Sequence, residues 1–242
     1  KNYKTVQLGY YSKAKELSLF SSGIISSIID QVTFPIFSNL RKNGSDEKLY
    51  YSKIIKLVSF ISFPSIVLLA ILARPIIIIL YGDEWVDMSI LLSLMAISRI
   101  LIPIKSLNMN YIKSIGRADL FLKMEMLQAP FYILAIFASI SFGLKSLVIS
   151  FILVEYVFFF VSMYFPFKFL KLSFLRQFKY IYKPAIGSVV MTLILLFLLP
   201  YIVLDVFKLI FGVIVGLFSY VVCMLLLKEE ICTGLFKKLK FY

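Results

Sequence analysis

Histidine is absent from the 242-residue sequence, cysteine occurs twice and tryptophan occurs once. The lack of histidine removes the most common general base and metal ligand, and the sequence predicts neither a metal site nor a cofactor. Cys223 lies inside an apolar run and Cys232 follows a charged tripeptide. The two thiols are therefore expected at different depths, without a disulfide between them.

Charged residues are also scarce, and this scarcity defines the class of the protein. They make up 16% of the chain, hydrophobic residues make up 61%, and the mean hydropathy is +0.94. A soluble domain has about 25% charged and about 45–50% apolar residues, so the composition predicts an integral membrane protein. The net charge of +13 comes from Lys and Arg between apolar runs. This distribution indicates membrane topology rather than a nucleic-acid groove.

Long apolar runs account for most of the sequence. A helix needs about 20 residues to cross the hydrocarbon core, and continuous runs argue against the alternating pattern of a β-barrel. The clearest run, Pro64–Trp85, ends in the acidic turn Gly82-Asp83-Glu84. We therefore predict one all-α transmembrane bundle over residues 1–242, with spans at approximately 16–38, 54–80, 88–112, 120–142, 144–167, 184–204 and 206–227.

The connections between these spans differ in charge and predict an orientation. Alternate connections (41–53, 113–123, 168–183 and the tail) hold sixteen Lys and Arg, whereas the others hold Lys145 and Lys208. Positive loops stay in the cytoplasm, so the C-terminus is predicted inside. Residues 1–15 are basic although seven spans would leave them outside. Either 16–38 does not span, or upstream helices fix the orientation, and the start at Lys1 rather than Met favours the second explanation.

The third span carries polar side chains with helical spacing. Arg99, Pro103, Ser106, Asn110 and Lys113 recur every three or four residues and share an arc of about 80° on one helix. Such a stripe is costly against lipid, so it should face a water-filled cavity or another helix. Four of these residues form the predicted substrate-binding set, namely Arg99, Ser106, Asn110 and Lys113. Lys105 lies off the stripe and should face a neighbouring helix or extend toward the interface.

Two carboxylates at membrane depth are candidates for ion or proton coupling. Asp30 belongs to a stripe of small hydroxyl residues in the first span, and Glu155 lies near the middle of the fifth. Glu155 has no cation on its own helix face, so we expect it to carry a proton if it is unpaired. The alternative is structural: Arg99 could form a buried ion pair with Glu155 or Asp30. The hydroxyl stripe is equally compatible with helix packing.

Short motifs, taken in their order, resemble a known family. GYYSKA (9–14), VTFPIFS (32–38), LYGDEW (80–85) and IGR (115–117) are similar to passages of the bacterial polysaccharide exporters. This family contains the oligosaccharide flippases for O-antigen and capsule. It lies in a superfamily with the multidrug extruders and the peptidoglycan-precursor flippase. The resemblance covers residues 9–120, and the remaining chain matches in hydropathy.

The resemblance implies a MATE-like fold of two helical lobes, of which this chain would be the C-terminal one, with the N-terminal half as its partner. It implies a multi-pass protein of the bacterial cytoplasmic membrane that flips undecaprenyl-diphosphate-linked oligosaccharide by alternating access, without enzymatic activity. The alternatives are a multidrug/cation antiporter, a membrane glycan polymerase and a structural membrane subunit. A net-positive cavity would favour the diphosphate lipid, and a net-negative one would favour a cationic drug.

Overall fold

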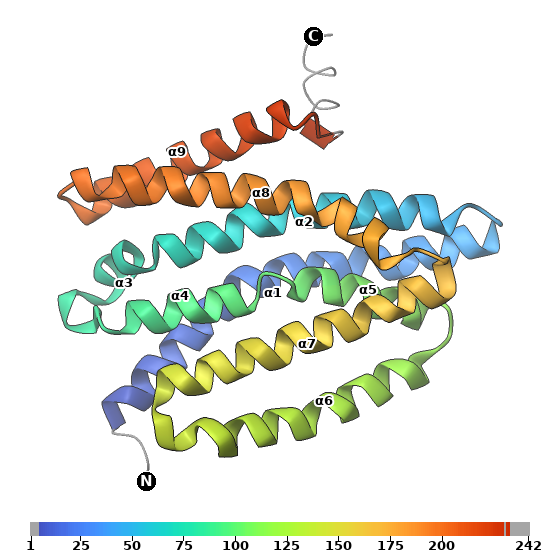
Figure 1. Cartoon of the computed structure of the whole chain (residues 1–242), viewed down its shortest axis with the longest axis horizontal. Helices are drawn as coiled ribbons and strands as arrows, with labels where there is room; N and C mark the ends of the chain where they lie inside the picture. Colours follow the sequence, from blue (N-terminus) through green and yellow to red (C-terminus); the bar gives the residue numbers. More distant parts are fainter. Residues whose placement is uncertain (1–4, 230, 233–242) are drawn as a thin grey trace.

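The computed structural model describes residues 5–229, 231 and 232, and most of this part of the chain is helical (Figure 1). Within it, seven segments are long and apolar enough to cross a membrane, which confirms the predicted fold class. The helices are α1 (Thr5–Lys42), α2 (Glu47–Ile71), α3 (Ala73–Tyr81), α4 (Met88–Ser98), α5 (Ile102–Ser114), α6 (Ala118–Ser139), α7 (Leu144–Leu170), α8 (Phe174–Leu198) and α9 (Asp205–Leu226).

The helices lie roughly side by side as one bundle (Figure 1). α1 packs along α4 and α5, which also contact α7, and α6 packs on α7. On the other side, α2 packs on α8 and α8 packs on α9. Large apolar side chains such as Phe137 and Phe218 point outward, with exposed fractions of 75% and 70%. This outer surface suits hydrocarbon rather than water, and the chain is a multi-pass membrane protein.

Several helices extend beyond the predicted spans or are interrupted within them. The first helix begins at Thr5 rather than at 16, and the sixth span begins at Phe174, so most of the predicted loop 168–183 is helical. The predicted span 54–80 begins at Glu47 and has a kink at Leu72 between α2 and α3. Pro75 explains the kink, because it has no N–H to donate to the Ile71 carbonyl and its ring would clash with that carbonyl.

The predicted third span is broken in its middle. α4 ends at Ser98 and α5 begins at Ile102, so Arg99 lies in a turn and not on a continuous helix. Pro103 in the first turn of α5 leaves the Arg99 carbonyl without its usual donor, and the Ile102 N–H bonds it instead at 3.1 Å. The Ile97 carbonyl, also in the interrupted turn, accepts a hydrogen bond of 2.9 Å from Tyr156 on α7.

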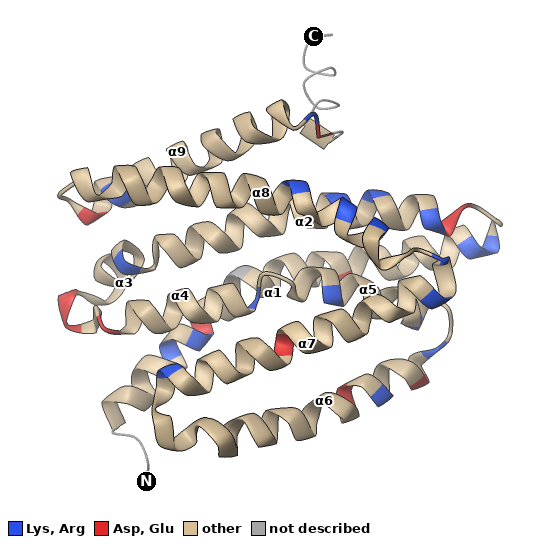
Figure 2. Cartoon of the chain, in the orientation of Figure 1, with Lys and Arg blue, Asp and Glu red and all other residues tan. Residues whose placement is uncertain are grey.

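Charge is distributed unevenly between the two ends of the bundle. Figure 2 shows Lys and Arg gathered at the end that holds the α1–α2, α5–α6 and α7–α8 connections. The turn with Asp83 and Glu84 lies at the opposite end. The basic connections counted in the sequence therefore share one end of the fold, although Lys237, Lys238 and Lys240 of the predicted tail lie outside the described residues.

Two glycines allow α9 to approach the α2–α3 kink closely. A Cβ atom at Gly212 would lie 2.6 Å from Leu72, and one at Gly216 would lie 2.6 Å from Leu68. The four-residue spacing puts both glycines on one face of α9, as in close contacts between other membrane helices. One turn further on, the Tyr220 hydroxyl donates to the Phe60 carbonyl at 2.9 Å. These contacts hold α9 against the bundle.

Replacing Gly216 by Val should weaken this contact. The added side chain must displace Leu68 and Leu195, and overpacking of this kind typically costs about 1–3 kcal/mol. Thermal unfolding in detergent should show a lower midpoint for Gly216→Val than for Gly23→Val. Gly23 is a matched control because a Cβ there meets nothing within 4 Å. Equal midpoints for the two variants would contradict the close packing of α9.

Candidate functional site

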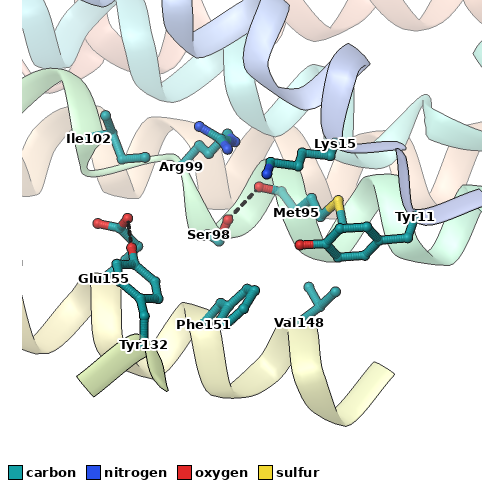
Figure 3. A pocket seen from close by; sticks show the side chains of 10 residues that line it. All are labelled: Tyr11, Lys15, Met95, Ser98, Arg99, Ile102, Tyr132, Val148, Phe151 and Glu155. Carbon is teal, nitrogen blue, oxygen red and sulfur yellow. Dashed lines mark hydrogen bonds between the residues drawn. The ribbon is translucent and has the colours of Figure 1, made fainter. Parts of the chain in front are cut away.

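The turn between α4 and α5 lines a cavity of about 360 Å³. Arg99 and Lys15 extend toward it, and Tyr132 and Glu155 face them from α6 and α7 (Figure 3). The side chains that line this cavity, called here the arginine cavity, come from α1, α4, the turn, α5, α6 and α7: Tyr11, Lys15, Met95, Ser98, Arg99, Ile102, Tyr132, Val148, Phe151 and Glu155.

Arg99 is held in the arginine cavity from the α1 side. Its Nε donates to the Ser18 hydroxyl at 3.1 Å, and its side chain is half-buried. Among the described residues, no carboxylate forms an ion pair with Arg99 or with Lys15. The structural alternative, an ion pair between Arg99 and Glu155 or Asp30, is therefore wrong. Two cations that form no ion pair with a described carboxylate line this partly apolar cavity, and such an arrangement favours the binding of an anion.

Glu155 pairs with Lys105 instead. The Lys105 Nζ lies 3.3 Å from Glu155 Oε2 and donates to Gln128 Oε1 at 2.7 Å. The Tyr132 hydroxyl donates to the other oxygen of Glu155 and accepts from Gln128 Nε2 at 3.2 Å. The condition attached to the Glu155 expectation, that this carboxylate is unpaired, is therefore not met, because a cation reaches it from α5 rather than from its own helix. Lys105 faces neighbouring helices, as one of the two expectations for it stated.

A second cavity of about 280 Å³ adjoins the first and is called here the asparagine cavity. Asn110 Nδ2 donates to Asp30 at 2.6 Å and to the Thr33 hydroxyl at 3.2 Å, which links α5 to α1. The Lys113 ammonium lies 3.9 Å from the centre of the Phe121 ring. The lining residues are Asp30, Ile102, Lys105, Ser106, Met109, Asn110, Lys113, Phe121, Glu125 and Glu155.

The structure thus distributes the predicted site residues over two neighbouring cavities. Ser106, Asn110 and Lys113 share the asparagine cavity with Asp30, whereas Arg99 lines the arginine cavity. Ile102 and Glu155 line both, so they lie on the boundary. Whether these residues bind substrate or couple an ion stays a prediction.

Sequence reasoning missed several residues of the arginine cavity. Tyr11 and Lys15 precede the predicted first span, yet they continue its hydroxyl stripe backward, since Tyr11, Lys15, Ser18 and Ser22 are spaced by four, three and four residues. That periodicity could have identified them. Tyr132 lies on another helix and shows no comparable signal in the sequence.

The described residues have the fold of about half of a MATE-like membrane protein. The chain is similar in structure to the lipid II flippase MurJ in its inward closed conformation, with a TM-score of 0.73. The similarity covers 95% of this chain and 49% of that chain, at 19% sequence identity. At this identity the likeness shows the fold, and the matched region spans about half the length of that protein.

Sequence comparisons identify the relatives. Residues 1–90 match the family described as polysaccharide biosynthesis protein. The chain is 25% identical over 188 residues to the teichuronic acid biosynthesis protein TuaB of Bacillus subtilis (strain 168). This match covers 77% of this chain and 39% of that protein. It is 20% identical over 198 residues to an uncharacterized membrane protein in the cps region of Klebsiella pneumoniae, covering 81% and 38%.

These matches confirm the resemblance to the polysaccharide flippase family that the motifs indicated. The chain spans about two fifths of the length of the two curated relatives.

The Lys105–Glu155 pair gives a testable consequence for stability. Lys105→Met should destabilise the protein by about 2–3 kcal/mol, because it leaves the Glu155 charge half-buried without a cation. Adding Glu155→Gln should restore much of the loss, since the remaining amide needs no counter-ion. The free energies of unfolding of both single variants and of the double variant, measured in detergent, give the coupling energy between the two side chains. Strictly additive losses would show that the pair does not exist in solution.

Proposed function

We propose that this chain forms the C-terminal lobe of a transporter that flips an undecaprenyl-diphosphate-linked oligosaccharide across the bacterial cytoplasmic membrane. The product would be used for a surface polysaccharide such as capsule, O-antigen or exopolysaccharide. The reaction is a translocation by alternating access and involves no covalent chemistry. The N-terminal half of the transporter is its partner, and the bilayer accommodates the lipid tail.

The charge of the arginine cavity is the observation that carries this proposal. Glu155 is neutralised by Lys105, which leaves Arg99 and Lys15 as excess positive charge. A diphosphate requires such compensation when it leaves water, and the planar guanidinium group is suited to bidentate contact with phosphate oxygens. A cationic drug would be repelled from the same cavity, so this charge favours the lipid-linked substrate over the antiporter alternative.

The asparagine cavity is suited to the sugar part of the substrate. Ser106, Asn110 and Asp30 offer donors and acceptors of the kind that hydroxyl groups require. Two lysines and three carboxylates line this cavity, so its charge is mixed and not positive. In this proposal the diphosphate binds near Arg99 and the adjoining sugars extend past Ile102.

The comparisons support the proposal at the level of class. One relative is named for teichuronic acid biosynthesis, and the structural neighbour is named as a lipid II flippase. The orientation is part of the proposal: the bundle end that carries the basic connections faces the cytoplasm, and the C-terminus is inside. The kinks at Leu72 and at Arg99–Leu101 are candidate hinges for alternating access.

Arg99→Ala should abolish transport, because the cavity loses its main phosphate-binding group. The measurement is surface polysaccharide in a strain that depends on the gene carrying this chain, with protein level determined in the membrane fraction. Arg74→Ala is the matched control, since Arg74 is exposed and lines neither cavity. Normal polysaccharide with Arg99→Ala at normal protein level would overturn the proposed role of the arginine cavity.

Asp30→Asn tests the proposed ion coupling. If Asp30 exchanges a proton during the cycle, the variant should lose the dependence of flipping on an imposed pH gradient while it still binds substrate. Proteoliposomes that contain the complete transporter and a lipid-linked oligosaccharide provide the assay. Glu125→Gln is the control, because Glu125 lines the same cavity at an exposed position. An unchanged gradient dependence in Asp30→Asn excludes Asp30 as the coupling residue.

A further inference from the structure

A third cavity, of about 390 Å³, lies away from the two described above and shares no lining residue with them. It is formed by α2, α8 and the segment after α9. Its charged residues are four cations and one carboxylate: Lys56, Arg176, Lys179, Lys183 and Glu229. Tyr180 and Tyr182 complete it. The proposed transport cycle makes no use of this basic pocket.

The cations of the pocket come mainly from one helix face. Arg176, Lys179 and Lys183 are spaced by three and four residues, which puts them within about 60° on α8. Lys56 reaches the pocket from α2, and its ammonium lies 5.4 Å from the centre of the Tyr180 ring. Cationic side chains from two helices that pack on each other, α2 and α8, thus line one pocket.

Part of this charge is already compensated and part is not. Lys183 Nζ lies 3.2 Å from Glu229 Oε2 and donates to the Lys228 carbonyl at 3.2 Å. Arg176 and Lys179 are exposed, and their side chains form no hydrogen bond or ion pair with any residue that the structure describes. These two cations are available to an anion with several oxygen atoms.

The depth of the pocket indicates where that anion lies. α8 has 25 residues, so it is about 37 Å long and exceeds the hydrocarbon core of about 30 Å. Its first turns, which carry Arg176 and Lys179, therefore lie at the level of lipid headgroups. Next to the cations on the same turns, Leu175, Phe178 and Tyr182 are exposed by 82%, 42% and 41%. A ligand held here meets cations on one side and an acyl-chain surface on the other.

We propose that the basic pocket between α2 and α8 binds the phosphate headgroup of an anionic phospholipid of the surrounding bilayer, with the acyl chains against Leu175 and Phe178. The ligand is a bilayer lipid and not the transported molecule, so the site goes beyond the proposed function. Basic pockets between membrane helices at the cytoplasmic side are suited to such headgroups. A bound headgroup also screens the repulsion between Arg176 and Lys179, which lie three residues apart on α8.

Native mass spectrometry of the full chain, titrated with phosphatidylglycerol or phosphatidylcholine in detergent, tests the site. Wild type should retain phosphatidylglycerol in preference to phosphatidylcholine. Arg176→Gln with Lys179→Gln should lower this retention by about threefold or more. The matched control is Lys42→Gln with Lys48→Gln, which removes the same charge at the same end of the bundle but outside the pocket.

Three outcomes would overturn the proposal: equal retention by wild type and the pocket variant, an equal loss in the control variant, or displacement of the lipid by millimolar glycerol phosphate or inorganic phosphate. The last outcome would assign the pocket to a soluble phosphate compound. Arg176 and Lys179 are exposed, so the variant should fold, and an unchanged thermal unfolding midpoint checks this. Transport measured with the same variant tests the proposed function separately, because Arg176→Gln with Lys179→Gln leaves the arginine cavity intact.

Discussion

Pro103 imposes the constraint on which the arginine cavity depends. Inside a membrane protein, backbone groups freed by a helix break must find partners within the protein, and here Tyr156 and the Ile102 N–H supply them. The break is therefore stable in the middle of the apolar segment Met88–Ser114. It turns Arg99 away from the stripe of α5 and toward α1, where Ser18 holds its guanidinium group. Without the break, Arg99 would continue the stripe that lines the asparagine cavity.

The Lys105–Glu155 pair complements this break. It binds α5 to α7, and with Gln128 and Tyr132 it also connects α6. Because the pair is neutral, the charge that remains in the arginine cavity is positive. Any movement that separates α5 from α7 must expose both charges to water or give them new partners. The Lys105–Glu155 pair therefore lies at the boundary between the two cavities, and movement of α5 against α7 would break it.

Charge has separate uses in different parts of the bundle. In the arginine cavity two cations lack carboxylate partners among the described residues, whereas at the basic end the cations of α8 line a pocket beside exposed apolar side chains. The first arrangement is suited to the proposed anionic substrate, and the second to the proposed phospholipid of the surrounding bilayer. The apolar outer surface between them requires no specific contact with its environment. The positions proposed for binding are thus a few polar sites within an otherwise hydrophobic bundle.

The sequence by itself determined the membrane class, the seven spans, the side of the bundle that is basic and the family resemblance. These follow from local composition, hydropathy and short motifs, which do not depend on contacts between helices. The tertiary structure alone decided that Glu155 pairs with Lys105, that Lys15 joins Arg99, and that the stripe of the third span is divided between two cavities. Pairing across helices depends on how their faces pack and where Pro75 and Pro103 interrupt them, and a periodic pattern within one helix contains no such information.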